Sequence, residues 1–299
     1  MNIQRHARIK LFIGIVLLFT LACNVSFSAG TPTAIPSTIP TSTNFVPAGP
    51  STAIPASSPT FTPIPTTTSV PPTATPTVLI SQQVSTTSIP IDETDPGSGY
   101  PPYTIKAQIP QLTGSGDPRV LAFNQLVNDR LTNEINTWRQ NFEQLLLTPN
   151  STGSSLDVRY TLIVQIGDLW SFKFDFDFYS DSAAHPGLNS MTLNYDLGQG
   201  KELSLGDLFL PNSNYLEIIA TYCTNELSKQ PFADPIFLEG AKPTKDNYRN
   251  WNITPDGLLI TFDEYQVAPY AAGPQQITVP YNELRTAINP QGPLSVIVK

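Results

Sequence analysis

The stretch "LWSFKFDFDFYSD" (Leu169 to Asp181) decides the fold of this chain. Its residues alternate between aromatic and polar, which is the period-two pattern of a β-strand. The aromatic face carries one tryptophan and four phenylalanines, at positions 170, 172, 174, 176 and 178. The opposite face carries Lys173, Asp175 and Asp177. Because so large an aromatic surface is unfavourable in water, a helix or a second sheet must cover it.

A long amphipathic helix upstream of this strand is the natural cover. Asp117 and Pro118 predict its start, as an N-cap followed by proline at the first helical position. The apolar positions that follow step by three or four: Val120, Phe123, Val127, Leu131, Ile135, Trp138, Phe142 and Leu145. We expect this stripe to face the core and to pack on the aromatic strand.

Periodicity and turn residues predict the remaining elements. They are an edge strand at 103–112, a strand at 156–168 paired with the aromatic strand, a hairpin turned at 198–200, a shorter amphipathic helix at 213–229, a hairpin turned at 255–257, and strands at 275–281 and 294–299. Together they predict an α+β fold, an antiparallel sheet packed by a long and a shorter amphipathic helix.

The first 23 residues have the pattern of an export signal. A cationic start is followed by the apolar run "LFIGIVLLFTLA" and then by Cys23. The quartet Thr20–Cys23 resembles the bacterial lipobox, although Thr20 stands where leucine is usual. We interpret 1–23 as a lipoprotein signal peptide with Cys23 as the lipidated residue, and an uncleaved membrane anchor is the alternative. Both interpretations predict a chain anchored to the outer face of the bacterial cell membrane.

Residues 24–100 are interpreted as a disordered stalk. From Thr31 onward the composition is dominated by threonine, proline, serine and alanine, and no charged residue precedes Asp92. Dense proline removes backbone donors and favours extended polyproline II, which cannot form a packed core. The serine and threonine content also permits O-glycosylation. Residues 101–299 are then expected to form one folded domain.

The acidic balance of the chain excludes some classes of partner. The formal net charge is −8 at pH 7. This sign disfavours nucleic acid and anionic membrane surfaces, and it favours basic protein partners. Cys223 would be the single cysteine left after processing at Cys23, so we expect no internal disulfide.

Residue patterns give little support for an enzyme, a metal site or a cofactor. His185 is the one histidine beyond the export signal, and no nucleophile motif accompanies it. Asp175 and Asp177 share a strand face, so a catalytic carboxylate pair is an alternative to a solvated face. Cys223 falls on the apolar face of its helix, which indicates a core position. We expect a protein that is not an enzyme and binds no cofactor.

Three motifs carry a family resemblance: "AAHPG" (183–187), "LNYDLGQGKELSLGDLF" (193–209) and "ITPDGLLITFDEYQVAPYAAGPQQITVPYNEL" (253–284). They resemble the extracellular domain of RsiV-type anti-sigma factors, a domain family that also precedes the catalytic domain of some peptidoglycan deacetylases. The resemblance extends from about Tyr103 to Leu284. It implies an α+β binding domain displayed outside the membrane, which in the anti-sigma factor binds lysozyme.

Two loops would carry the contacts to a partner if the resemblance holds. The candidate binding residues are His185, Pro186, Tyr265, Pro269, Tyr270 and Gly273. Strand alternation puts Tyr265 on the same face as Asp263 and Val267, so Tyr265 is also a candidate framework residue. About ten residues precede the apolar run, too few for a sigma-binding region, and one histidine does not make a deacetylase site.

Three functions remain open. The leading hypothesis is a surface-anchored binding or sensing domain for lysozyme or a cell-wall glycan. The alternatives are a structural or adhesion domain without a soluble ligand, and an enzyme that acts on polysaccharide through residues such as Asp175 and Asp177.

Overall fold

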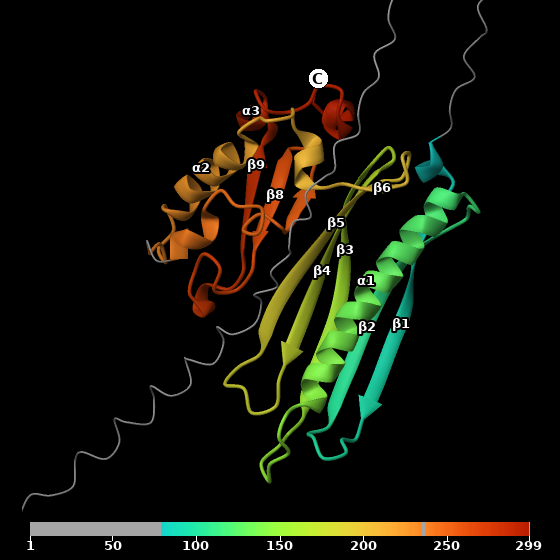
Figure 1. Ribbon diagram of the computed structural model, residues 1–299, viewed down its shortest axis with the longest axis vertical. Coiled ribbons are helices and arrows are strands. Elements are labelled where there is room, and N and C mark those ends of the chain that lie inside the picture. The colour runs from blue at the N-terminus through green and yellow to red at the C-terminus, as the bar shows by residue number, and fades with distance from the viewer. Residues whose placement is uncertain (1–78, 235–236, 299) are drawn as a thin grey trace, which may run out of the picture. The chain divides into compact units, whose positions relative to one another are not determined.

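The computed structural model describes residues 79–234 and 237–298. Within these ranges the strands form a six-stranded sheet, in the order β1-β2-β3-β4-β5-β6, and a three-stranded sheet, in the order β7-β8-β9 (Figure 1). The strands are β1 (Ser85–Asp95), β2 (Tyr103–Thr113), β3 (Ser154–Ile166), β4 (Leu169–Tyr179), β5 (Gly187–Asp196), β6 (Lys201–Glu202), β7 (Trp251–Ile253), β8 (Gly257–Phe262) and β9 (Gln275–Pro280). The α-helices are α1 (Pro118–Glu143), α2 (Tyr215–Leu227) and α3 (Tyr281–Leu284). This architecture confirms the predicted α+β fold.

Helix α1 covers the aromatic face of β4, as the sequence predicts. Figure 1 shows α1 lying along one face of the six-stranded sheet. The rings of Phe123 and Phe172 are 5.4 Å apart, and those of Trp138 and Phe178 are 4.3 Å apart. At the start of the helix, the Asp117 carboxylate accepts a hydrogen bond from the Arg119 backbone amide at 2.9 Å. The apolar faces of α1 and β4 therefore form the centre of this core, to which β2, β3 and β5 also contribute buried residues.

The chain enters and leaves α1 in a strand–helix–strand crossover. β2 and β3 are neighbours and run parallel, whereas every other neighbouring pair within the described ranges is antiparallel. A parallel neighbour needs a long connection to return the chain to the same end of the sheet, and α1 provides it. The sheet is thus antiparallel apart from this pair.

The boundary between stalk and domain was placed too far along the chain. Residues 85–95, assigned to the stalk, form β1, which pairs with β2 from Ser85↔Thr113 to Asp95↔Tyr103. The predicted edge strand is therefore an interior strand. The composition of β1 matches the stalk, but Ile91 packs on the core and Glu93 pairs with Arg139 of α1. Pro90 is tolerated because β1 lies at the sheet edge, where one side of the backbone needs no partner.

A second core lies under the three-stranded sheet. Ile219, Cys223 and Leu227 form the buried face of α2, in one cluster with Ile260 and Phe262 of β8. The predicted core position of Cys223 is therefore confirmed. The strand expected at 294–299 is wrong, because Pro293–Val296 form a 3-10 turn. Pro293 suits the first position of such a turn, and Leu294 alone among its four residues is buried.

Side chains join the two sheets along the free edge of β7. The Trp251 amide donates to Thr192 Oγ1 at 3.1 Å, and Asn194 Nδ2 donates to the Trp251 carbonyl oxygen at 2.7 Å. The Ile253 amide donates to Ser171 Oγ at 3.2 Å and to Asn194 Oδ1 at 3.1 Å. β7 pairs with β8 on its other side. Polar side chains of β4 and β5 thus replace the strand that β7 lacks, and they fix the second sheet against the first.

Some of the predicted features lie outside the described residues. These are the export signal, Cys23 and the stalk up to residue 78. Across the ranges 79–234 and 237–298, no helix is both long and apolar enough to cross a membrane.

Candidate binding site

The segment between β4 and β5 meets the segment between β8 and β9. The Tyr265 hydroxyl lies 3.3 Å from Nε2 of His185, and the Tyr270 hydroxyl donates to the carbonyl oxygen of Pro186 at 2.9 Å. The ring of His185 stacks on that of Tyr270, with centroids 3.8 Å apart and planes 26° apart. The ring centroid of Tyr265 is 5.7 Å from that of Tyr270. We call His185, Tyr265 and Tyr270 the aromatic cluster.

The aromatic cluster is accessible to a partner. His185 and Pro186 are exposed, Tyr265 is 56% exposed, and Tyr270 is half-buried. Such a ring set offers flat apolar area together with hydroxyl and imidazole groups, and tyrosine loses little conformational entropy when it is bound. The cluster can therefore recognise a surface by contact and hydrogen bonding.

Tyr265 is not part of the framework, although strand alternation suggested that it is. Asp263 and Val267 are buried, as expected for that face, but β8 ends at Phe262. The chain then turns, and Tyr265 adopts a φ of 64°, in the left-handed region. The alternation rule fails here because it holds only while the chain stays extended.

The hydrogen bonds of the aromatic cluster define one tautomer of His185. Nδ1 lies 2.8 Å from the Pro186 carbonyl oxygen, which can only accept, so Nδ1 carries the hydrogen. In the neutral ring Nε2 is then an acceptor, and the Tyr265 hydroxyl donates to it.

Pro269 and Gly273 shape the turn that presents Tyr270. The 3-10 turn η4 (Tyr270–Ala272) begins after Pro269, whose φ is −65°. It ends at Gly273, whose φ is 66° and whose amide donates to the Tyr270 carbonyl oxygen at 2.8 Å. A glycine adopts that conformation without strain. These two predicted binding residues therefore position Tyr270 through the backbone.

Two acidic residues that the sequence analysis did not select hold the loops together. Glu264 accepts a hydrogen bond from the Leu188 amide at 3.1 Å, and the buried Asp263 accepts one from the Ser190 amide at 2.9 Å. Arg249 forms an ion pair with Asp263. The signal in the sequence is the Asp-Glu pair directly after a buried strand. Both carboxylates act as anchors that set the His185 segment beside Tyr265 and Tyr270.

The other candidate carboxylates are engaged with cations. Asp175 pairs with Lys173 and Asp177 with Arg159. The polar face of β4 is not simply solvated, because Ser171 and Lys173 on it are buried beside the second sheet. No group of three or more histidine, cysteine, aspartate or glutamate side chains in the described part of the chain is placed to hold a metal ion.

Comparison with known proteins identifies one matching family model and several curated relatives. Residues 206–282 match the family model "Protein of unknown function (DUF3298)". The peptidoglycan-N-acetylmuramic acid deacetylase PdaC of Bacillus subtilis is 31% identical over 111 residues, 36% of this chain and 24% of the relative. The immunogenic protein MPT64 of Mycobacterium tuberculosis is 28% identical over 96 residues, 32% of this chain and 42% of the relative. The chain thus spans less than half the length of either relative.

Two solved structures share the fold. A DUF3298 family member from Bacteroides fragilis superposes with a TM-score of 0.52 at 16% identity, covering 71% of this chain and 96% of that one. A second member, from Pseudomonas aeruginosa, gives a TM-score of 0.50 at 18% identity, covering 69% of this chain and 95% of that one. Residues 206–282 are thus similar to the DUF3298 family and part of the chain is similar to PdaC, which confirms the family resemblance predicted from the motifs.

Proposed function

We propose that this chain displays a binding domain outside the cytoplasm, and that the aromatic cluster is its contact surface. One observation carries the proposal. Three aromatic side chains from two segments about 80 residues apart stack at an exposed site, where two carboxylates and the Pro186 carbonyl oxygen hold them in place. Side chains with only a structural role are usually covered, whereas exposed and rigid tyrosines are typical of binding hot spots.

The preferred partner is a basic protein, with lysozyme as the specific candidate. The chain has a net charge of −8, which accelerates encounter with a cationic protein and orients it. The family resemblance supports lysozyme in particular. In this mechanism the aromatic cluster enters a cleft of the partner, and lipidation at Cys23 keeps the domain at the outer face of the membrane.

A cell-wall glycan is the second candidate partner, because the name of PdaC refers to peptidoglycan. Flat aromatic rings also stack on the faces of sugar rings, so the aromatic cluster would be the contact surface for a glycan as well. The proposal involves no chemical step at Asp175 or Asp177. Peptidoglycan hydrolysis by the purified protein, abolished by Asp175→Asn and Asp177→Asn, would contradict that part of it.

The test is a calorimetric titration of the full-length protein with a basic lysozyme at moderate salt. Tyr265→Ala and Tyr270→Ala should each weaken binding by about 30-fold, the effect of a hot-spot residue. Leu146→Ala is the control, because Leu146 is an 84% exposed apolar side chain outside the aromatic cluster. Raising the salt concentration should also lower the affinity.

The outcomes separate the partners. Absence of heat at ~100 μM lysozyme, a concentration that detects dissociation constants well above the micromolar range, would exclude the lysozyme version. Co-sedimentation with insoluble peptidoglycan would then identify the glycan version, provided that Tyr270→Ala abolishes it. Binding of either partner that is insensitive to both tyrosine variants would overturn the assignment of the aromatic cluster.

A further inference from the structure

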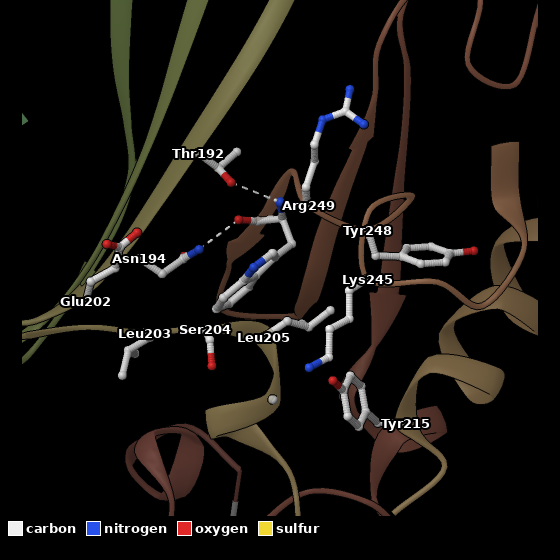
Figure 2. Close-up of a pocket in the computed structure, with 12 residues that line it drawn as sticks. Thr192, Asn194, Glu202, Leu203, Ser204, Leu205, Tyr215, Lys245, Tyr248 and Arg249 are labelled. Carbon is white, nitrogen blue, oxygen red and sulfur yellow. Dashed lines mark hydrogen bonds between the residues drawn. The ribbon is translucent and has the colours of Figure 1, made fainter. Parts of the chain in front are cut away.

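A concave site lies apart from the aromatic cluster and shares no residue with it. It is a pocket of about 300 Å³ between β5, the segment from β6 into the 3-10 turn Leu205–Leu208, the start of α2 and the chain that enters β7. Ligand pockets usually measure about 300–1,000 Å³, so this one suits a small molecule. Its apolar lining includes Leu203, Leu205 and Trp251. Figure 2 shows the side chains that surround it.

Most polar groups of the pocket are already engaged. Glu202 forms two hydrogen bonds with Arg130 of α1, both at 2.7 Å, which neutralise its charge. Arg249 pairs with Asp263, and in Figure 2 its guanidinium points away from the other side chains. The Ser204 hydroxyl donates to Asp207 at 2.7 Å. Neither Glu202 nor Arg249 therefore sets the charge of the pocket.

Two donors in the pocket remain without a partner. Across the described ranges, the ammonium of Lys245 and the hydroxyl of Tyr215 form no hydrogen bond or ion pair. In Figure 2 both polar ends point into the space near Ser204 and Leu205. The Tyr215 ring is held in place, because it stacks on Phe209 with centroids 4.5 Å apart and planes 6° apart. Burial also raises the pKa of the phenol, which keeps its hydrogen available for donation.

Gly206 keeps the approach to these donors open. A Cβ atom built on Gly206 would lie 3.4 Å from the Tyr215 hydroxyl oxygen and 4.0 Å from Ser204 Oγ. The backbone of Gly206 is not in the left-handed region, so alanine would fit the chain but narrow the pocket. A side chain at this position would therefore take up space beside the Tyr215 hydroxyl.

We propose that this pocket binds a small organic monocarboxylate, with one carboxylate oxygen on Lys245, the other on the Tyr215 hydroxyl, and its apolar part on Leu203 and Leu205. One cation and one hydroxyl match a single negative charge with two acceptor oxygens. A phosphate dianion would need more donors than these. The local charge is positive although the chain as a whole is acidic, and this inference does not depend on the function proposed for the aromatic cluster.

The experiment is ligand-observed NMR and calorimetry of the full-length protein with N-acetylalanine, in both enantiomers. A ligand of so few atoms should bind with a Kd on the order of 1 mM. Lys245→Met and Tyr215→Phe should each weaken binding about tenfold, because each removes one donor to a charged group. Gly206→Ala should weaken it as well, by closing the space above the Tyr215 hydroxyl.

Matched controls make the result decisive. Lys242→Met removes another exposed lysine, which pairs with Glu239 outside the pocket, so binding should be unchanged. Lys245→Arg should retain most of the affinity. The proposal is overturned if N-acetylalanine does not bind at about 50 mM, far above the expected Kd, if Lys242→Met costs as much as Lys245→Met, or if inorganic phosphate binds more tightly than the carboxylate. Circular dichroism spectra that match the unmodified protein establish that each variant is folded.

Discussion

Replacement of Asn194 by alanine should destabilise the fold by about 3 kcal/mol. Asn194 is 2% exposed and lies on β5, where its side chain completes the free edge of β7. It donates to the Trp251 carbonyl oxygen at 2.7 Å and accepts from Ser171 Oγ at 2.6 Å and from the Ile253 amide at 3.1 Å. Alanine removes all three hydrogen bonds and leaves a cavity beside β7.

The magnitude follows from which groups lose their only partner. The Ile253 amide keeps Ser171 Oγ at 3.2 Å, but the Trp251 carbonyl and the Ser171 hydroxyl hydrogen do not have a second partner among the described residues. Each buried polar group left unpaired costs about 1–3 kcal/mol, which gives about 2–6 kcal/mol for the two. Asn194 also lines the pocket, so water can reach the vacated space. We therefore expect a value in the lower half of that range.

Urea denaturation followed by circular dichroism measures this free energy. The same loss should lower the Tm by about 6–12 °C in a domain of this size. Asn189→Ala is the matched control, because Asn189 lies on the same strand, is exposed and forms no side-chain hydrogen bond within the described residues. It should change stability by less than about 0.5 kcal/mol.

A double-mutant cycle with Ser171→Ala adds a second check. Ser171 and Asn194 share one hydrogen bond and both contact Ile253, so their effects should be coupled by about 1 kcal/mol. A loss of less than about 1 kcal/mol for Asn194→Ala, together with strictly additive effects in the cycle, would refute the idea that these side chains join the sheets.

Three other predictions concern single residues. Burial raises the pKa of the Cys223 thiol to about 12, so at pH 8 the thiol should react with a thiol reagent only after unfolding. The stability that this thiol contributes is complete below its unfolded pKa of about 8.5 and is lost as the pH rises towards 12. A hydrogen bond from the Arg119 side chain holds the pKa of Asp117 at about 2, so Asp117→Asn should lower the Tm at pH 7, with the difference disappearing as the pH falls from about 4 through 2. In Gly240→Ala the new Cβ atom would overlap a backbone carbonyl of the turn after β8, so the free energy of unfolding measured in a urea titration should fall by about 3 kcal/mol or more. Gly116→Ala should be close to neutral, because no atom lies within 4 Å of its Cβ position.

The elements that the sequence predicted are those with a strong internal period. The aromatic alternation from Trp170 to Phe178 and the apolar stripe that begins at Val120 each specify one buried face. In the structure these two faces pack against each other. The sequence does not predict β1, because its serine, threonine and proline content matches that of the residues before it. Its strand state depends on β2, which no local pattern reveals. The opposite error occurs at residues 294–299, where β-branched residues predict a strand that does not form. Strand propensity is not enough when no neighbouring strand edge is available for pairing.

The sequence predicted individual residues of the candidate site but not how they lie relative to one another. The motifs around His185 and Tyr270 marked both, but the 3.8 Å stack between their rings depends on the anchors Asp263 and Glu264. The pocket left no signal at all in the sequence. Its two free donors come from distant segments without a characteristic spacing, and whether a lysine is paired can be judged only once its neighbours in space are known.

The Arg249–Asp263 ion pair lies between the aromatic cluster and the pocket. Arg249 lines the pocket and pairs with Asp263, which also accepts the Ser190 amide and so holds β5 beside the turn of Tyr265. A substitution of Asp263 would therefore disturb both sites, and its effect on binding could not be assigned to either. Tyr270 and Lys245, in contrast, each belong to one site alone. If N-acetylalanine changes the affinity for a protein partner in the unmodified chain but not in Lys245→Met, occupancy of the pocket is coupled to binding at the aromatic cluster.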